Sequence, residues 1–301
     1  MWKLFARRQD APAVPGDLWQ VTLRSKSDFE SMVAVHAPLF AARRNWEKSL
    51  AKALPADEAT SLSGYCAVCG KESNFRYDHQ YAESGTVNWR ERLLCAHCGL
   101  NNRQRLALHV LAAQMDRRRA RIYATEQTTP TARSLARLYP EVMLSEFLGP
   151  GWQGGQHDRS GLRHEDVTRL SFASDQFDRV LSFDVLEHVP DYRAALREFA
   201  RVTRRGGRLL LTVPQHLGSE QNVVRAKLDG AGCPVHLMPP EYHGDPVNPE
   251  SGILCYYHFG WELLRDLLDA GFDDAFVTLW WSHEFAYVGY EQAVLTAIKT
   301  A

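Results

Sequence analysis

The fold is decided by one stretch of the sequence, Phe177-Asp-Arg-Val-Leu-Ser-Phe-Asp184-Val-Leu-Glu-His-Val189. Residues 179–183 form a short, largely apolar run, which predicts a buried strand. Residues 192–202 carry apolar side chains at helical spacing, which predicts a helix. Two glycines then lead into a second apolar run at 208–213, which predicts another strand. Strand, helix and strand in this order indicate a βαβ unit with parallel strands.

The same alternation of apolar runs and amphipathic segments continues on both sides of this stretch. Strands that alternate with helices are typical of an open, doubly wound parallel sheet. We therefore predict an α/β fold with a Rossmann-like sheet over residues 106–301. The further elements expected are a helix at 106–119, strands at 122–125 and 142–145 with a helix at 130–138 between them, a weaker segment ending at Asp166, a helix at 261–270, and strands at 276–280 and 293–298.

The composition is that of an ordinary globular protein. The 301 residues are 45% hydrophobic and 24% charged, with a formal net charge of −1, which excludes a disordered or low-complexity chain. No apolar run reaches the roughly 18 residues of a membrane-spanning helix, so we expect no span and no secretory signal. The near-neutral charge argues against a surface built wholly for nucleic acid.

Two smaller parts are expected ahead of the sheet. Residues 1–60 predict a helical N-terminal segment, with one helix around 29–40 and a second at 41–54 that ends before Pro55. The polar stretch 55–64 indicates a linker. Residues 61–105 then form a module that holds four of the six cysteines.

The cysteines of this module form two Cys-x-x-Cys pairs, Cys66 with Cys69 and Cys95 with Cys98, each followed by glycine. Two residues between thiolates let both sulfurs reach one ion, and four thiolates suit tetrahedral Zn²⁺. Such a closed site has no open coordination position, so the zinc would be structural. The alternatives are reduced pairs without metal, or a redox disulfide.

The interval between the pairs is longer than the roughly 15–20 residues that are typical, and a hairpin within 75–94 would absorb the difference. This use of cysteine favours a reducing, cytoplasmic compartment.

Arginines gather behind the second cysteine pair. Arg103 and Arg105 follow it, and Arg117, Arg118, Arg119 and Arg121 come soon after. A zinc module with arginines can bind RNA, although arginines on a connecting helix more often form a solvated face. Nucleic acid therefore stays a possible partner that the overall charge does not favour.

The region around the opening stretch carries four motifs in a fixed order: Asp166-Val-Thr-Arg-Leu-Ser-Phe172, the opening stretch itself, Leu196-Arg-Glu-Phe-Ala-Arg-Val-Thr-Arg-Arg-Gly-Gly207 and Leu209-Leu-Leu-Thr-Val-Pro214. In residue type, order and spacing they resemble the class I S-adenosylmethionine-dependent methyltransferases of type 11. The resemblance extends over about 120–301. It implies a transferase that binds S-adenosylmethionine at the carboxyl ends of the strands.

Acidic residues recur where that cofactor would bind. Glu126, Glu146 and Asp166 are each 20 positions apart, about one βα unit per step. Carboxylates at strand ends can hold a ribose diol, because each one accepts several hydrogen bonds. The resemblance implies that Glu146 takes the ribose hydroxyls, that Asp166 with Val167 meets the adenine amino group, and that Asp184 lines the cofactor.

The segment after the first strand departs from the family. The family has a glycine-rich loop there, whereas residues 122–130 contain no glycine. Thr129 can cap the following helix with Pro130 in its first position, so a helix N-terminus still faces the cofactor carboxylate. Glu126 would then pair with the cofactor's α-amino group. If these contacts do not replace the glycines, the domain is a scaffold without activity.

A base is needed if the methyl acceptor must lose a proton, and histidine suits this near neutral pH. His188 follows the strand 179–183, and His243 lies in a turn-rich loop where Glu241 and Asp245 can orient it. These two histidines are the candidate catalytic residues. A sugar, glycan or other small-molecule hydroxyl is the acceptor we expect.

Three functions remain open from the sequence. The first is an O-methyltransferase with a structural zinc module. The second is a non-catalytic scaffold that binds a partner, and the third is an RNA methyltransferase that uses the zinc module for RNA. A dehydrogenase is less consistent, because the G-x-G-x-x-G fingerprint is missing.

Overall fold

The computed structural model describes residues 18–55, 57–82, 86–115, 120–244, 250 and 252–300. The chain divides into two compact units. The first comprises the residues up to Leu23 with Glu30–Gln114 and Thr278–Val294, and the second comprises Arg24–Phe29, Met115–Val277 and Leu295–Ala301. Residues 106–114 and 278–294, which the sequence assigns to the sheet domain, thus belong to the first unit.

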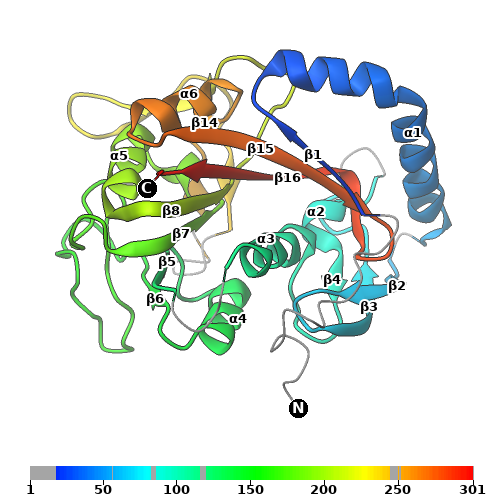
Figure 1. The fold of residues 1–301 in the computed structure, drawn as a ribbon, viewed down its shortest axis with the longest axis horizontal. Coiled ribbons are helices and arrows are strands. Elements are labelled where there is room, and N and C mark those ends of the chain that lie inside the picture. The colour runs from blue at the N-terminus through cyan, green and yellow to red at the C-terminus, as the bar shows by residue number, and fades with distance from the viewer. Residues whose placement is uncertain are drawn as a thin grey trace. The chain divides into compact units, whose positions relative to one another are not determined.

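The second unit is built on a mostly parallel sheet (Figure 1). Its strands follow the order β6 (Met143–Leu144), β5 (Ile122–Ala124), β7 (Phe177–Phe183), β8 (Thr203–Thr212) and β16 (Tyr287–Ile298). The first four strands run parallel to their neighbours, and β16 pairs antiparallel with β8. Both faces of β5 and β7 are buried, as in parallel sheets that helices cover. The predicted α/β fold with a Rossmann-like sheet is confirmed.

The helices α4 (Pro130–Leu138) and α5 (Tyr192–Val202) connect β5 to β6 and β7 to β8. Both have the bounds expected from the sequence. Each begins where a side chain caps it: Thr129 Oγ1 accepts from the Ala132 N–H, and Asp191 accepts from the Ala194 N–H. The apolar stripe of α5 is buried, which supplies the stabilisation that a short helix needs.

The strand order places a topological switch point beside β5. β6 follows β5 on one side of it, and β7 lies on the other. In open α/β sheets, ligands bind in the crevice beyond the carboxyl ends of the strands at such a point. The residues that follow β5, β6, β7 and β8 are therefore the ones to inspect.

The weaker strand expected to end at Asp166 is wrong. The structure has only isolated bridges there, between Glu146 and His164 and between His157 and Arg163. The segment 157–166 is mostly polar and contains Gly161 at a φ of +87°, so no alternating apolar run is available for a sheet face.

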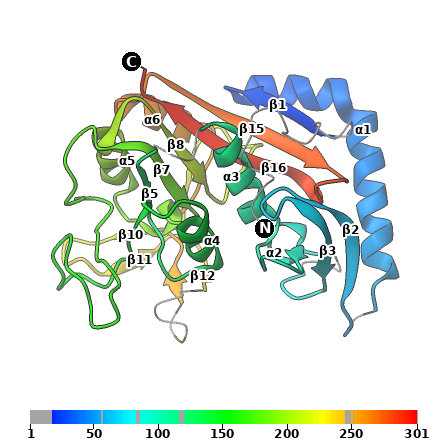
Figure 2. The ribbon, with the colours of Figure 1, turned by 60° about the horizontal axis from the view of Figure 1, so that its bottom comes forward.

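Between β8 and α6 (Glu262–Asp269) the second unit carries short antiparallel pairs, which can be followed in Figure 2. The sequence predicted no regular element at 239–246. This was wrong for residues 242 and 243, which form a short strand that pairs with residues 253 and 254. Beyond α6 comes β15 (Asp274–Ser282). The pairs are β10 (Ala226–Leu228) with β11 (Pro234–His236), β12 (Tyr242–His243) with β13 (Ile253–Leu254), and β14 (Tyr257–His258) with β9 (Val223–Val224).

The first unit contains β1 (Trp19–Leu23), which pairs with β15, and most of the long helix α1 (Lys26–Ala53). Two helices were expected here, but α1 is continuous and includes Pro38. Its buried residues recur at helical spacing on both sides of the proline, so one continuous buried face holds the helix together. They are Met32, Phe40, Arg43, Glu47 and Ala51.

The cysteine module of the first unit is a three-stranded sheet of β2 (Thr60–Cys66), β3 (Lys71–Tyr77) and β4 (Leu94–Cys95). The expected hairpin within 75–94 is met in part, because β3 and β4 close this interval as an antiparallel pair, Phe75 with Cys95 and Arg76 with Leu94. A further hairpin joins β2 to β3, and its turn is the first cysteine pair itself. The helices α2 (Trp89–Arg92) and α3 (Asn102–Ala113) follow. No helix in the described part of the chain is long and apolar enough to cross a membrane.

Candidate functional site

The four paired cysteines converge on one point in the first unit. Cys66 Sγ lies 3.9 Å from Cys98 Sγ, and Cys69 Sγ lies 3.9 Å from Cys95 Sγ. Tetrahedral Zn–S bonds of about 2.3 Å place sulfurs about 3.8 Å apart. Gly70 and Gly99, at φ values of +68° and +71°, turn the chain back after each pair. The geometry fits a closed, four-thiolate zinc module.

Polar neighbours support the thiolate form of Cys95. Ser73 Oγ lies 3.1 Å from Cys95 Sγ, and the His97 N–H donates to the same sulfur at 3.4 Å. Hydrogen bonds from the neighbouring thiols, that of Cys66 first, together with Ser73 lower the pKa of Cys95. Metal-bound cysteines must be deprotonated, so these contacts favour a metal ligand.

Of the described arginines behind the module, Arg103 and Arg105 are held by contacts within the protein. Arg105 is fully buried, lies 4.2 Å from the Phe75 ring, and donates to the carbonyls of Phe285 and Ala286 at 2.7 and 2.9 Å. Arg103 Nε donates to Glu91 Oε1 at 2.7 Å. Arg117–Arg119 lie outside the described residues. Arg105 is therefore a structural residue.

The loop after β5 carries the first two cofactor candidates of the second unit. Glu126 is buried two residues beyond the strand, and its Oε2 accepts the hydroxyl hydrogen of Thr129. Thr129 is also the N-cap of α4, with Pro130 at the first helical position, as expected. An acid thus lies within one turn of a helix N-terminus that can receive a carboxylate.

Glu146, two residues beyond β6, reaches across to the same loop. Its Oε1 accepts hydrogen bonds from the Gln127 N–H at 2.8 Å, the Thr128 N–H at 2.9 Å and the Thr128 hydroxyl at 2.7 Å. The glycine-less loop is therefore held by a carboxylate. The second oxygen, Oε2, is the one that a ribose hydroxyl would reach.

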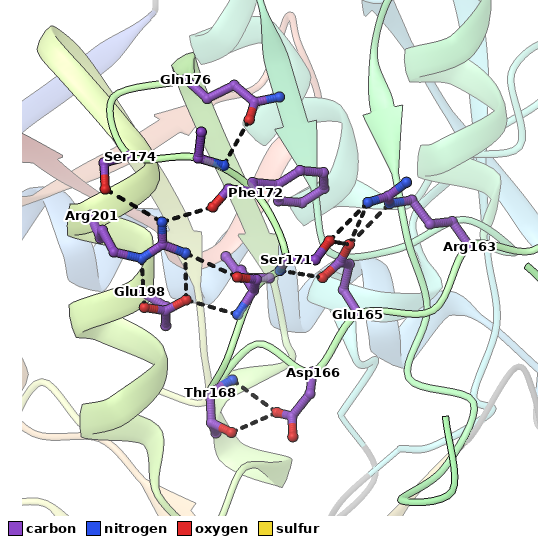
Figure 3. A network of polar contacts seen from close by, with 12 residues as sticks. Arg163, Glu165, Asp166, Thr168, Ser171, Phe172, Ser174, Gln176, Glu198 and Arg201 are labelled. Atoms are coloured by element: carbon purple, nitrogen blue, oxygen red, sulfur yellow. Dashed lines mark hydrogen bonds and ion pairs between the residues drawn. The ribbon is translucent and has the colours of Figure 1, made fainter. Parts of the chain in front are cut away.

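Asp166 and Val167 are half-buried at the edge of the crevice. Asp166 Oδ1 accepts from the backbone and hydroxyl of Thr168 at 2.9 and 2.7 Å, which leaves Oδ2 for another donor (Figure 3). Buried Glu165 beside it accepts from Arg163 and Ser171. These contacts hold the segment in place, although it does not form a strand.

Asp184 directly follows β7 and has a φ of +52°. A non-glycine residue in this region costs free energy and often marks a functional site. Its backbone N–H donates to the Thr212 carbonyl at 2.8 Å. Within the described residues, the buried hydroxyls of Thr125, Ser182 and Thr212, at the ends of β5, β7 and β8, have no hydrogen-bond partner. Buried polar atoms are normally paired, so the crevice fits a polar ligand.

The two candidate catalytic histidines are 55 residues apart in sequence but lie together. The rings of His188 and His243 are 4.9 Å apart and nearly perpendicular, at 88°. His188 belongs to η1 (Leu186–His188), just beyond β7, and His243 to β12. His188 Nδ1 lies 2.9 Å from the Leu254 carbonyl. The end of β7 and the short strand pairs therefore bring the two histidines together.

The Glu241 carboxylate contacts three side chains that carry, or can carry, a positive charge. Its Oε1 lies 2.9 Å from His243 Nε2 and 3.1 Å from His258 Nε2, and Arg225 pairs with its Oε2 at 3.1 Å. Although burial opposes it, hydrogen bonding from the two histidines lowers the pKa of Glu241. The expectation that Glu241 orients His243 is met, whereas Asp245 lies outside the described residues.

Sequence reasoning missed one residue of this cluster, Glu187. Its side chain is completely buried, and Oε1 lies 3.8 Å from His188 Nε2 and 3.9 Å from His243 Nδ1. Its position inside the motif Asp184-Val-Leu-Glu-His188 was the only available signal, because the contact with His243 is not local in sequence.

The fold defines the second unit as a Rossmann-like domain. Residues 110–211 match the family model Methyltransf_11, which is described as a methyltransferase domain.

Curated relatives share only part of their length with this chain. Demethylmenaquinone methyltransferase from Mycobacterium marinum is 59% identical over 46 residues, which are 15% of this chain and 20% of that protein. Methyltransferase GfsG from Streptomyces halstedii is 36% identical over 76 residues, 25% of this chain and 27% of that protein.

Solved structures with similar folds have low identity. The 1,6-didemethyltoxoflavin-N1-methyltransferase of Burkholderia thailandensis, with 1,6-didemethyltoxoflavin and S-adenosylhomocysteine bound, is 21% identical; 66% of this chain and 79% of that chain are covered at a TM-score of 0.38. An S-adenosylmethionine-dependent methyltransferase from Mesorhizobium loti is 13% identical, with 64% and 97% covered and a TM-score of 0.36.

Proposed function

We propose that this protein is an S-adenosylmethionine-dependent methyltransferase that methylates a hydroxyl of a small molecule, sugar or glycan. The observation that carries the proposal is the set of acids and buried hydroxyls at the carboxyl ends of β5, β6, β7 and β8, inside a methyltransferase domain. These groups supply the donors and acceptors that a nucleoside cofactor with an amino-acid tail requires.

Each part of the cofactor has a matching group in the crevice. Glu146 Oε2 would accept from the ribose hydroxyls, and Asp166 with Val167 would meet the adenine. Glu126 would pair with the α-amino group, while the N-terminus of α4 at Thr129 would take the carboxylate. Asp184 would line the cofactor next to the reacting methyl group.

The bound cofactor supplies a methyl group on a positively charged sulfur. In the transfer, the C–S bond breaks with its electron pair going to sulfur, and a bond forms between the acceptor oxygen and the methyl carbon. The acceptor's proton leaves to an imidazole nitrogen. His243 and His188 are our candidates for this base, and Glu241 stabilises His243 as it gains the proton.

The side chains around the histidines favour a polar, uncharged acceptor. Tyr242 is 56% exposed next to His243 and offers a ring face on which a sugar can stack. Tyr256 is buried, and the Tyr257 hydroxyl donates to the Pro190 carbonyl, so these two rings are structural. The net charge of −1 gives no general attraction to nucleic acid.

We further infer that the four cysteines hold a structural Zn²⁺. The sulfur spacing and the support for the thiolate form favour this role. A closed four-thiolate site provides no coordination position for a substrate, so the zinc would stabilise the first unit rather than take part in methyl transfer.

A scaffold without activity is the second candidate, and one observation favours it. The Glu146 carboxylate already accepts three hydrogen bonds from its own loop, which lacks the glycines of the family. If this contact competes with ribose, the cofactor does not bind.

Methyl transfer can be tested with labelled S-adenosylmethionine against a panel of sugars, glycans and small hydroxylated acceptors. Incorporation of the labelled methyl group into a methyl ether supports the proposal. His243→Ala should lower kcat about 100-fold or more while cofactor binding is unchanged, since a base acts only on the acceptor. His157→Ala, an exposed histidine of the same unit, is the matched control. Cofactor binding without any labelled acceptor oxygen contradicts the choice of acceptor, and absent cofactor binding favours the scaffold.

A further inference from the structure

Two imidazoles converge on one buried carboxylate at the end of β7. Glu187 Oε1 lies 3.8 Å from His188 Nε2 and 3.9 Å from His243 Nδ1. Both distances are too long for hydrogen bonds. Each of the three residues offers one atom that can ligate a metal, and these three atoms all lie within 4.8 Å of one another. The Glu187 side chain is fully buried, His188 is 8% exposed and His243 is 33% exposed, so the cluster is open on the His243 side.

The outer contacts of both rings decide which nitrogens carry lone pairs. The Leu254 carbonyl can only accept, so His188 Nδ1, 2.9 Å away, carries the hydrogen. Glu241 Oε1 likewise accepts from His243 Nε2 at 2.9 Å. In the neutral rings, the lone pairs then belong to His188 Nε2 and His243 Nδ1. These are the two nitrogens that face Glu187.

This arrangement is typical of metal-binding histidines. A ligating histidine usually donates its other N–H to a backbone carbonyl or a carboxylate, which fixes the tautomer and the ring orientation. Here the His188 ring donates to a backbone carbonyl, and the His243 ring donates to a carboxylate. Glu241 is itself held by His258 and Arg225 at 3.1 Å each, so it stays in place as an anion.

We propose that Glu187, His188 and His243 bind a divalent transition-metal ion, separate from the cysteine site. Two nitrogen lone pairs that face a buried carboxylate oxygen repel it, and a cation between them turns the repulsion into attraction. Two histidines and one carboxylate are a set that binds Fe²⁺ and similar first-row ions. Donors at bond lengths of about 2.1 Å lie about 3.0–3.5 Å apart, so the two distances from Glu187 to the histidines would shorten by about 0.3–0.9 Å when an ion binds.

Three protein ligands leave coordination positions open for a substrate oxygen or water. The metal site does not depend on the proposed function, but its use does. If the protein methylates a hydroxyl, the acceptor would bind to this ion, which lowers the pKa of a coordinated hydroxyl. His243 and His188 would then act on the acceptor through the ion instead of taking its proton themselves.

The test is metal binding by the full-length protein without cofactor or acceptor. The protein is equilibrated with excess Co²⁺, unbound metal is removed, and cobalt and zinc per chain are measured by mass spectrometry together with the visible spectrum. We expect an ion beyond the thiolate-bound one, with weak bands that lack thiolate-to-cobalt charge transfer. His243→Ala should lose this ion, and the matched control His157→Ala should keep it.

A second variant guards against misfolding of the first. Glu241→Gln removes the negative charge behind His243 without removing a ligand, and it should raise the Kd for Co²⁺ about 10- to 100-fold. The proposal is overturned if the wild type takes up no additional ion, or if His243→Ala and Glu241→Gln bind Co²⁺ as the wild type does. An ion without cofactor binding would refute only the proposed function, and cofactor binding without the ion would refute only this site.

Discussion

Replacement of Glu146 by alanine should weaken S-adenosylmethionine binding without unfolding the protein. The carboxylate has two roles in our account: Oε1 holds the loop after β5 through three hydrogen bonds, and Oε2 takes the ribose hydroxyls. Hydrogen bonds to a charged acceptor contribute about 1.5–3 kcal/mol each. Loss of one such contact with ribose raises the Kd about 10- to 100-fold.

The effect on folding should be smaller. Gln127 and Thr128 are only half-buried, so water can replace the lost acceptor, and we expect a decrease of about 1–2 kcal/mol in the free energy of unfolding. Calorimetric titration gives the Kd, and urea denaturation gives the stability. Glu146→Gln keeps an acceptor oxygen for the loop, so its Kd and its stability should lie between those of the wild type and of Glu146→Ala. Glu141→Ala, an exposed glutamate ahead of β6, is the control. An alanine variant that binds the cofactor within about twofold of the wild type would refute the ribose role.

Three further predictions concern the first unit and the helix cap. Burial lowers the pKa of His109 to about 4. The unfolded chain therefore takes up a proton near pH 6.5 that the folded protein does not take up. As a result, the free energy of unfolding falls by about 2 kcal/mol from pH 7 to pH 5. In denaturation curves His109→Gln should lose most of this pH dependence, and an unchanged slope contradicts the assignment. Cys95→Ser should release zinc and destabilise the first unit; a zinc-free variant as stable as the wild type would show that the module does not need metal. Thr129→Ala should cost about 1 kcal/mol through the lost cap of α4 and weaken cofactor binding, and equal affinity by titration would remove the N-terminus of α4 from the site.

Local signals in the sequence were sufficient for the elements that build the crevice. α4 and α5 have the expected bounds because a capping side chain, Thr129 or Asp191, directly precedes an apolar stripe of helical period. The cysteine pairs were equally clear, because their spacing and the following glycines define a turn. Where local chemistry determines an element, the sequence alone predicts it.

Elements that depend on distant partners were not predictable. β12 is two polar residues long and exists because β13 pairs with it across a loop. α1 continues through Pro38 because its buried face extends on both sides, although proline usually ends a helix. The segment before Asp166 is held by Arg163, Glu165 and Ser171 instead of by strand pairing.

The candidate site shows the same division. The acids that we propose for cofactor binding were suggested by their regular spacing, which follows from the repeating βα unit. From the sequence, His188 and His243 could each be proposed as a base, but their contact with each other could not be predicted. The role of Glu187 was missed altogether, because it depends on a chain segment more than fifty positions away that folds back over the end of β7.

The most direct test of the account is calorimetric titration of the intact, folded protein with S-adenosylmethionine and S-adenosylhomocysteine. We expect both to bind in the micromolar range, since the acids, the N-terminus of α4 and the buried hydroxyls replace the missing glycine loop. If neither compound binds at millimolar concentration to protein that is folded and retains its zinc, the crevice is not a cofactor site and the protein is not a methyltransferase.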